Sequence, residues 1–342
     1  MNITKAQKDG YTLISVANDA GMLLRLTSLG AGIREIIVPD KNGQRQTVTL
    51  CPVDEEVYKS GYHGKTIGRT SGRINGARFT VDGNTAVLEK NNCGEDNLHG
   101  GATGLHAQSF EYEIKETENG VDVVFAYLSP HGEGGYFGEV KINVIYRIYG
   151  GQNRFDIIFE GAPSQKTLLN LTNHVYLNMG GGLSESVLSQ TLYLNASHVG
   201  RLNERLIVEE LVPVSEEFDF RTPHKIGEHI AADSVQQYTK GYDHPFFLKE
   251  GGLDKTACAL QSDKSGIRLE IRTTYPCVVL YTDNYADSSV EVYRGRYDEQ
   301  YLAACLECQY HPDGVHQSPE SCGIVSPEKP YREVIEYRFK LV

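Results

Sequence analysis

Apolar and polar residues alternate with a period of two along most of the chain. Clear examples are TLISVA at 12–17, VKINVIYRIY at 140–149 and VIEYRFKLV at 334–342, and clusters of Gly, Asp and Asn separate such runs. Successive side chains of a β-strand point to opposite faces, so the pattern predicts antiparallel strands joined by short turns. One segment, 225–238, is the best candidate for a short helix.

The chain of 342 residues shows no linker, no low-complexity segment and no clear internal repeat. A chain of this length commonly forms about two domains, but large all-β chains often form one. The predicted strands run from the first residues to the last. We therefore expect an all-β protein, a large antiparallel β-sandwich in which residues 1–342 form a single domain.

The stretch LLNLTNHVYLNM at 168–179 has an unusual polar side. Read as one strand, its apolar side consists of Leu169, Leu171, Val175, Leu177 and Met179, interrupted only by Asn173. Its polar side consists of Asn170, Thr172, His174, Tyr176 and Asn178. A sheet face that only meets water more often carries Lys, Glu, Thr and Ser, so this side predicts a surface that binds a polar molecule. The alternative is that its one titratable group, the imidazole, is an ordinary solvated histidine.

A second predicted strand, LAACLECQY at 302–310, carries a carboxylate among apolar and sulfur-containing residues. Cys305, Glu307 and Gln309 share one of its faces. A carboxylate in such a run is costly to bury unless it has partners or a task. Partial desolvation would raise its pKa and make it a better proton acceptor near neutral pH. Glu307 and His174 are thus a candidate acid–base pair, with a structural ion pair as the alternative for Glu307.

The charge balance excludes several classes of partner. The net charge of -12 argues against nucleic acid and anionic membranes, because both require a basic surface. No apolar run approaches the roughly 18 residues that span a bilayer, and the N-terminus lacks the features of a signal peptide. We expect a small-molecule substrate and a monomer or homodimer, without nucleic-acid or membrane partners.

The seven cysteines are an odd number scattered along the chain, which favours free thiols in a reducing cytoplasm. Cys305 and Cys308 have CxxC spacing, but no second pair follows them. On a strand their sulfurs would face opposite ways, so the spacing does not favour a zinc site.

With these residues identified, the sequence resembles the galactose mutarotases, or aldose 1-epimerases, over nearly its whole length. The elements of the resemblance occur in family order: GRI at 72–74, NLHGG at 97–101, NHVYLN at 173–178, DFR at 219–221, GYDH at 241–244 and LECQ at 306–309. Each is weak alone, but the ordered set is specific.

The resemblance implies a β-supersandwich with a sugar bound in an open cleft on one sheet. It implies mutarotation of free aldohexoses such as galactose and glucose, with Glu307 as the general base and His174 as the general acid. It implies sugar binding by Arg73, His99, Tyr176 and Asp243. This chemistry requires neither a metal nor an organic cofactor.

Two positions depart from the family pattern. Gly72 stands where many members have an Asn, and Val279 stands where some members have a sugar-binding Gln. Both departures concern which hydroxyls are recognised and leave the acid–base pair intact.

Three other functions remain as alternatives. A mutarotase for hexose 6-phosphates would use Arg69 or Arg73 to bind the phosphate. A non-catalytic sugar-binding module would be expected to have lost the Glu or the His, and both are present. A glycosidase would need two suitably spaced carboxylates, such as Asp243 and Glu307.

Overall fold

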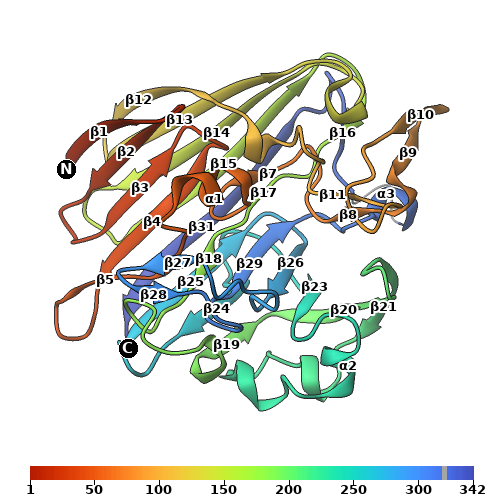
Figure 1. The fold of residues 1–342 in the computed structure, drawn as a ribbon. Coiled ribbons are helices and arrows are strands. Elements are labelled where there is room, and N and C mark those ends of the chain that lie inside the picture. The colour runs from red at the N-terminus through yellow and green to blue at the C-terminus, as the bar shows by residue number, and fades with distance from the viewer. Residues whose placement is uncertain (318–321) are drawn as a thin grey trace.

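The computed structural model describes residues 1–317 and 322–342, and its main layer is a nine-stranded antiparallel sheet (Figure 1). In the strand β14 (Val140–Tyr149) of this layer, alternate residues from Val140 to Ile148 are completely buried, so the period of two seen in the sequence marks the side that faces the core. In spatial order the strands are β12 (Glu111–Thr117), β13 (Gly120–Ser129), β14 (Val140–Tyr149), β15 (Arg154–Pro163), β31 (Tyr331–Leu341), β25 (Ile267–Thr273), β24 (Cys258–Gln261), β19 (Thr191–Leu194) and β22 (His224–Lys225).

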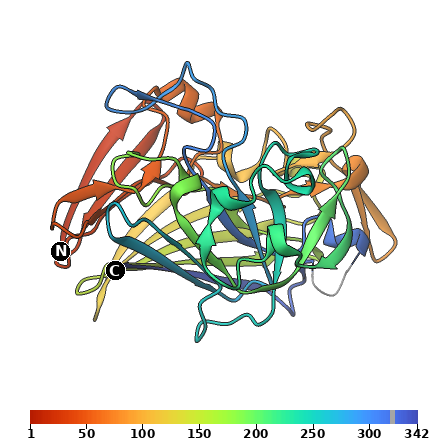
Figure 2. The same ribbon diagram turned by 90° about the horizontal axis from the view of Figure 1, so that it is seen from below.

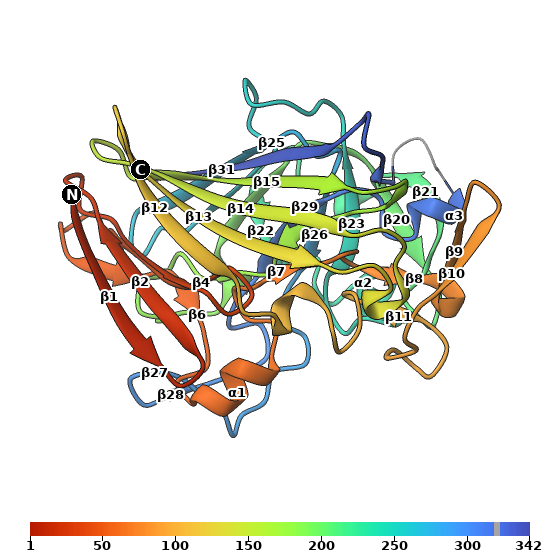
Figure 3. The same ribbon diagram turned by 90° about the horizontal axis from the view of Figure 1, so that it is seen from above.

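A five-stranded sheet forms a second layer beneath the first (Figure 3). One of its faces supplies Phe246, Val278 and Leu306 to the main hydrophobic core, which also contains Val144 and Ile271 of the large sheet. The two sheets therefore form a sandwich, and the all-β prediction is confirmed. In spatial order the strands of the second sheet are β21 (Val208–Pro213), β20 (Ala196–Leu202), β23 (Asp243–Leu248), β26 (Cys277–Tyr281) and β29 (Cys305–Gln309).

The N-terminal residues form another five-stranded antiparallel sheet, and both chain termini lie at the same end of the molecule (Figure 2). The hairpin of β9 (Arg78–Val81) and β10 (Asn84–Val87) lies at the opposite end (Figures 1 and 3). The strands of the N-terminal sheet are β1 (Asn2–Lys8), β2 (Tyr11–Ala17), β3 (Leu23–Thr27), β4 (Gly32–Pro39) and β5 (Arg45–Thr47).

Short ladders and short helices connect these sheets. The paired strands are β6 (Thr49–Leu50) with β18 (Tyr176–Leu177), β7 (Thr66–Ile67) with β17 (Thr172–Asn173), β8 (Arg73–Ile74) with β11 (Asn97–Leu98), β9 (Arg78–Val81) with β10 (Asn84–Val87), β16 (Thr167–Leu168) with β30 (Ile324–Val325), and β27 (Glu291–Tyr293) with β28 (Arg296–Tyr297). The α-helices are α1 (Glu55–Ser60), α2 (Asp233–Gln236) and α3 (Gly314–Gln317). Within the described ranges, no helix has the length and apolar composition needed to span a membrane.

The prediction of one continuous strand over 169–179 is wrong. The segment contains two two-residue strands instead, because it pairs in turn with two different partners: β17 with β7, and β18 with β6. Just before it, β16 pairs with a third strand, β30. Every residue from 169 to 179 is buried, so its polar side is enclosed and does not meet bulk water. Asn170, Asn173 and Asn178 use their amides to bond backbone carbonyls of neighbouring segments.

The predicted helix over 225–238 is also mostly wrong. That segment contains a 3-10 turn at Ile226–Glu228 and the four-residue helix α2, separated by irregular backbone. Ile226 and Val235 are the residues that these two turns bury. Two buried positions anchor a loop adequately, but they do not supply the apolar stripe that stabilises a longer helix.

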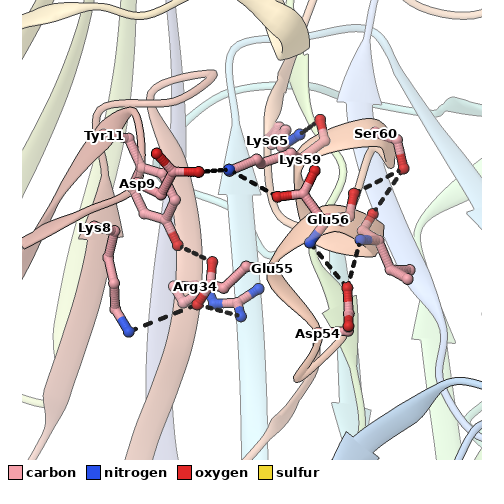
Figure 4. Close-up of polar contacts among 11 residues, drawn as sticks. Lys8, Asp9, Tyr11, Arg34, Asp54, Glu55, Glu56, Lys59, Ser60 and Lys65 are labelled. Carbon is pink, nitrogen blue, oxygen red and sulfur yellow. Dashed lines mark hydrogen bonds and ion pairs between the residues drawn. The ribbon is translucent and has the colours of Figure 1, made fainter.

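Helix α1 is fixed to the N-terminal sheet by charged side chains (Figure 4). The Asp54 carboxylate caps the helix by accepting the N–H groups of residues 56 and 57. Lys59 Nζ lies 2.6 Å from Asp9 Oδ2 and 2.9 Å from Glu56 Oε1, and the Tyr11 hydroxyl donates to Glu55 at 2.5 Å. These contacts set the position of the chain that leaves the helix.

Lys65 links this charged cluster to the middle of the fold. Its buried Nζ donates to the Lys59 carbonyl at 2.8 Å and lies 4.9 Å from the centroid of the Tyr58 ring. Its own carbonyl accepts the His174 N–H at 2.9 Å, next to the ladder of β7 and β17. The helix contacts therefore help to fix the backbone that carries the central histidine.

Candidate active site

A pocket of about 290 Å³ opens on the face of the second sheet that is turned away from the core. All six residues singled out in the sequence line it: Arg73, His99, His174, Tyr176, Asp243 and Glu307. They come from widely separated parts of the chain, and the fold brings them together.

Strand register explains how the floor of the pocket is built. Directly opposed residues of antiparallel strands point to the same face. Asp243 is opposite Tyr281 in β26, and Val279 of β26 is opposite Glu307 in β29. Asp243 and Glu307 therefore share a face across three strands, whereas intervening residues such as Leu306 point into the core.

His174 reaches this floor from the segment that follows β17. Its carbonyl accepts the Gly64 N–H at 2.9 Å, which complements the bond from its own N–H to Lys65. The ring Nε2 lies 3.5 Å from Glu307 Oε1, and the ring Nδ1 lies 3.4 Å from Cys305 Sγ. The predicted acid–base partners thus face each other at the bottom of the pocket.

Burial shifts the pKa values of these partners in opposite directions. Desolvation, with a smaller contribution from the charge of Asp243 and opposed by Arg73, raises the pKa of Glu307 to about 8. Desolvation lowers the pKa of His174 to about 4. Between these two pH values the pair holds one titratable proton in total, and in the unliganded protein it favours the carboxyl of Glu307.

Aromatic rings surround the imidazole of His174. The centroid of its ring lies 5.1 Å from that of Tyr176 and 6.1 Å from that of Tyr62, both stacked, and 5.4 Å from that of His99, edge to face. Such packing restricts the orientation of the imidazole and excludes water from its faces.

Arg73 and Asp243 form a second polar group at the pocket wall. Arg73 Nη2 lies 3.7 Å from Asp243 Oδ2. Burial raises the pKa of Asp243, and the neighbouring guanidinium of Arg73 opposes that rise. Arg73 Nε is buried and has no hydrogen-bond partner among the described residues, so it can donate to a bound molecule.

His99 follows β11, where the ladder with β8 ends. Its Nδ1 accepts the Gly72 N–H at 3.2 Å. Burial, followed by the nearby charges of His174 and Arg73, lowers the pKa of His99 well below its usual value. The ring is therefore neutral, and because Nδ1 accepts a bond, its proton lies on Nε2 and can be donated.

The two departures from the family pattern both lie at this pocket. Val279 stands beside Glu307 on the floor and offers no polar group. Gly72 adopts a φ of 71°, and a side chain there would bring its Cβ within 3.0 Å of Pro312 Cβ. Both positions therefore lie where a bound molecule would contact the pocket.

Arg69 does not belong to the pocket, although it was a candidate phosphate ligand in the sequence. Its guanidinium is buried and donates to the Ser129 hydroxyl and to the carbonyls of Ser129, Pro130, Phe137 and Gly138. All five N–H donors of the side chain are thereby used. Arg69 holds loops together and cannot also grip a phosphate group.

Sequence reasoning missed several residues that line the pocket. Tyr62 follows α1 in a loop without a recognisable pattern, so no sequence signal would have found it. Tyr281 could be placed there only from strand register. Gln309 lies two residues beyond Glu307 on the same face, which is a signal that the alternation of β29 did provide. The motif Asp219–Arg221 lies elsewhere, where the two side chains pair with each other.

One group of side chains has the ligand types that bind a metal ion. Ligand atoms of His174, Cys305 and Glu307 lie within 4.8 Å of one another. Nitrogen, sulfur and oxygen together match the preferences of zinc. However, Cys305 faces Nδ1 of the ring and Glu307 faces Nε2, so a single ion could not use both short contacts without turning the imidazole. Cys308 points the other way, into the main core.

Comparison with known proteins gives consistent results. The family model for aldose 1-epimerase matches residues 12–338. The galactose mutarotase of Homo sapiens is 33% identical over 321 residues, which cover 92% of this chain and 90% of that protein. The aldose 1-epimerase of Escherichia coli (strain K12) is 30% identical over 349 residues, which cover 96% of this chain and 95% of that protein.

Solved structures show the same fold. An aldose epimerase homologue from C. elegans superposes with a TM-score of 0.87 at 25% identity and covers 97% of this chain and 100% of its own. A galactose 1-epimerase from Lactobacillus acidophilus NCFM superposes with a TM-score of 0.85 at 23% identity, covering 99% and 98% respectively.

Proposed function

The chain belongs to the aldose 1-epimerase family, and we propose that it interconverts the α and β anomers of free aldohexoses such as galactose and glucose, with Glu307 and His174 as its acid–base pair. Members of this family are isomerases of carbohydrate metabolism, so the chain is an enzyme of that class. The separation of 3.5 Å between His174 Nε2 and Glu307 Oε1, at the bottom of a polar pocket, is the observation that carries the assignment of the pair.

The proposed reaction moves one proton at each end of the C1–O5 bond. The Glu307 carboxylate takes the proton of the C1 hydroxyl while the protonated His174 donates its Nε2 proton to the ring oxygen. The C1–O5 bond breaks, and the open-chain aldehyde rotates about C1–C2. Ring closure with reversed proton transfers gives the other anomer and restores both groups. Each positioned proton transfer typically contributes about 10²–10⁴-fold to the rate.

The pair needs one proton to carry out this cycle. In the unliganded protein that proton favours Glu307, because burial penalises the charged form of both side chains. A sugar hydroxyl that donates to Glu307 favours the carboxylate. We propose that sugar binding moves the proton from Glu307 to His174, across the 3.5 Å that separate them, and so creates the reactive form.

Four further residues hold the sugar in this proposal. Asp243 accepts hydrogen bonds from hydroxyls, Arg73 and the neutral His99 donate them, and Tyr176 supports one face of the site beside His174. Fixed partners for the other hydroxyls keep the open-chain aldehyde in place until it closes again. The proposal routes no step through a metal or an organic cofactor.

The neutral sugar is favoured over its 6-phosphate. Arg73 is the one Lys or Arg among the described residues that line the pocket, and it already pairs with Asp243. Arg69 has no free donor. The net charge of -12 further disfavours a substrate that carries nearly two negative charges.

Polarimetry of freshly dissolved α-anomers tests the function. We expect the enzyme to accelerate equilibration of galactose and glucose far above the buffer rate, and of their 6-phosphates much less. Rates equal to the buffer blank for both free sugars, with sugar binding detected by calorimetry, would support the sugar-binding module instead. A phosphate ester preferred at low salt, with the preference lost at high salt, would support the phosphate alternative.

Two less specific proposals concern where the protein acts and with what. We propose a cytoplasmic enzyme, supported by free thiols at Cys51, Cys93, Cys258, Cys277 and Cys305. Its proposed partner is the sugar alone, with no nucleic acid or membrane, and it acts as a monomer or homodimer. Sedimentation of the purified enzyme would determine which of the two it is.

A further inference from the structure

We propose that Cys305 is a positioning residue for His174. The Cys305 sulfur accepts a hydrogen bond from the Nδ1–H group of the imidazole throughout the reaction. The inference rests on the acid role proposed above for His174. It concerns the back of the ring, away from the substrate, because Cys305 does not line the pocket.

The imidazole lies across β29 and contacts two residues of that strand. Cys305 and Glu307 are two positions apart, so both side chains point to the same face. Cys305 Sγ lies 3.4 Å from Nδ1, and Glu307 Oε1 lies 3.5 Å from Nε2. Each ring nitrogen therefore has one partner, and the nitrogen that faces Glu307 is the one whose proton must move.

A buried thiol is suited to the other nitrogen. Cys305 is completely buried, and burial raises the pKa of its thiol well above the usual value, so the group stays neutral. Its sulfur can accept the Nδ1–H bond. With Nδ1 keeping its proton, Nε2 is bare in the neutral imidazole and protonated in the imidazolium. This is the change that proton delivery to the sugar ring oxygen requires.

The weakness of a neutral sulfur acceptor also matters. A carboxylate at this position would stabilise the imidazolium and make it a poorer acid. Sulfur fixes the same tautomer with little stabilisation of the cation. This agrees with the lowered pKa of His174, and a strongly acidic imidazolium suits donation to a weakly basic ether oxygen.

Substitutions at Cys305 separate this role from simple packing. Cys305→Ala removes the acceptor, and we expect kcat to fall by about 10–100-fold, the range seen when a metal-ligating histidine loses the partner that orients it, with KM changed less than twofold. Cys305→Ser supplies a neutral oxygen acceptor and should keep kcat within about threefold of the wild type. Cys308→Ala is the matched control, because it makes the same change on the same strand but on the face that packs in the core.

A spectroscopic measurement gives a second readout that does not depend on turnover. Long-range nitrogen NMR of the histidine rings should show neutral His174 with its proton on Nδ1 in the wild type and in Cys305→Ser. In Cys305→Ala a mixture of tautomers should appear. A Cys305→Ala enzyme with wild-type kcat and pH profile, or a wild-type ring protonated on Nε2, would overturn the inference.

Failure of the proposed function would look different. A wild-type enzyme that does not accelerate mutarotation removes the catalytic role of the pair, whatever the tautomer of His174. Normal wild-type turnover combined with an unaffected Cys305→Ala enzyme removes only the role of Cys305.

Discussion

The burial of Glu307 predicts that this residue destabilises the fold at high pH. The pKa of Glu307 is raised from 4.5 to about 8, mainly by desolvation. Between those values the folded chain binds a proton that the unfolded chain has lost, so the stability falls as pH rises. The difference between a pKa of 4.5 in the unfolded chain and about 8 in the folded chain corresponds to roughly 5 kcal/mol once pH exceeds the folded pKa.

Replacing Glu307 by Gln isolates this contribution. Gln has nearly the size of the protonated Glu and never ionises, so the two proteins should be about equally stable below pH 4.5. Above that pH the variant should become progressively more stable than the wild type, by roughly 5 kcal/mol at pH 9. Urea denaturation at pH 4.5, 7 and 9 measures the difference.

Glu116→Gln is the matched control, because Glu116 is exposed on β12 and the same substitution there should leave the pH dependence of stability unchanged. A difference between the Glu307→Gln variant and the wild type that is constant from pH 4.5 to 9 would refute the argument. It would mean that Glu307 titrates normally and that the pocket does not desolvate it.

Three other substitutions have defined outcomes. Asp243→Asn should lower kcat/KM about tenfold or more, because charged hydrogen bonds to sugar hydroxyls are lost. It should also move the alkaline limb of the pH profile, expected near pH 8, to lower pH, because Asp243 helps to raise the pKa of Glu307. Unchanged kinetics would make Asp243 a structural residue only. Arg69→Met should lower the free energy of unfolding in urea by about 3–5 kcal/mol, because it leaves several buried carbonyls unpaired. KM measured at low temperature should stay the same. A raised KM would show that Arg69 does contribute to sugar binding. Gln309→Met should raise the stability of the sugar-free protein by about 1 kcal/mol or more, because neither polar atom of this buried amide has a partner among the described residues. A loss of stability in urea would show that the amide does form hydrogen bonds.

The alternation of apolar and polar residues predicted the all-β fold class and which residues of a strand share a face. The buried residues of β14 and the shared face of Glu307 and Gln309 in β29 follow directly from a period of two. The family resemblance, confirmed by the match over residues 12–338, supplied the arrangement of the sheets. That the chain forms one domain stays a prediction, although one core cluster includes residues from Ile14 to Phe339.

Long-range pairing could not be predicted from local pattern. The segment 169–179 alternates like one strand, yet it divides between two partner strands, and nothing local encodes that division. Arg69 and Arg73 lie four residues apart in the same glycine-rich segment, yet only one of them reaches the pocket. The difference depends on carbonyl groups at residues 129–138, which become neighbours of Arg69 only in the fold.

The roles given to the six site residues stay predictions, but their convergence has a physical cause. Asp243 and Glu307 meet on one face because β26 lies between their strands, and His174 meets Glu307 because its backbone pairs with Lys65 beside β7. The spacing within each motif is local, whereas these contacts depend on sheet register.

Turnover of freshly dissolved α-galactose by Glu307→Gln and His174→Asn, followed by polarimetry beside the wild type, tests the central claim most directly. Each variant should reduce kcat by about 10²–10⁴-fold, because each removes one positioned proton transfer. Circular dichroism should show that both variants keep the wild-type fold. Turnover within tenfold of the wild type by either folded variant would contradict the acid–base role of the residue that it replaces.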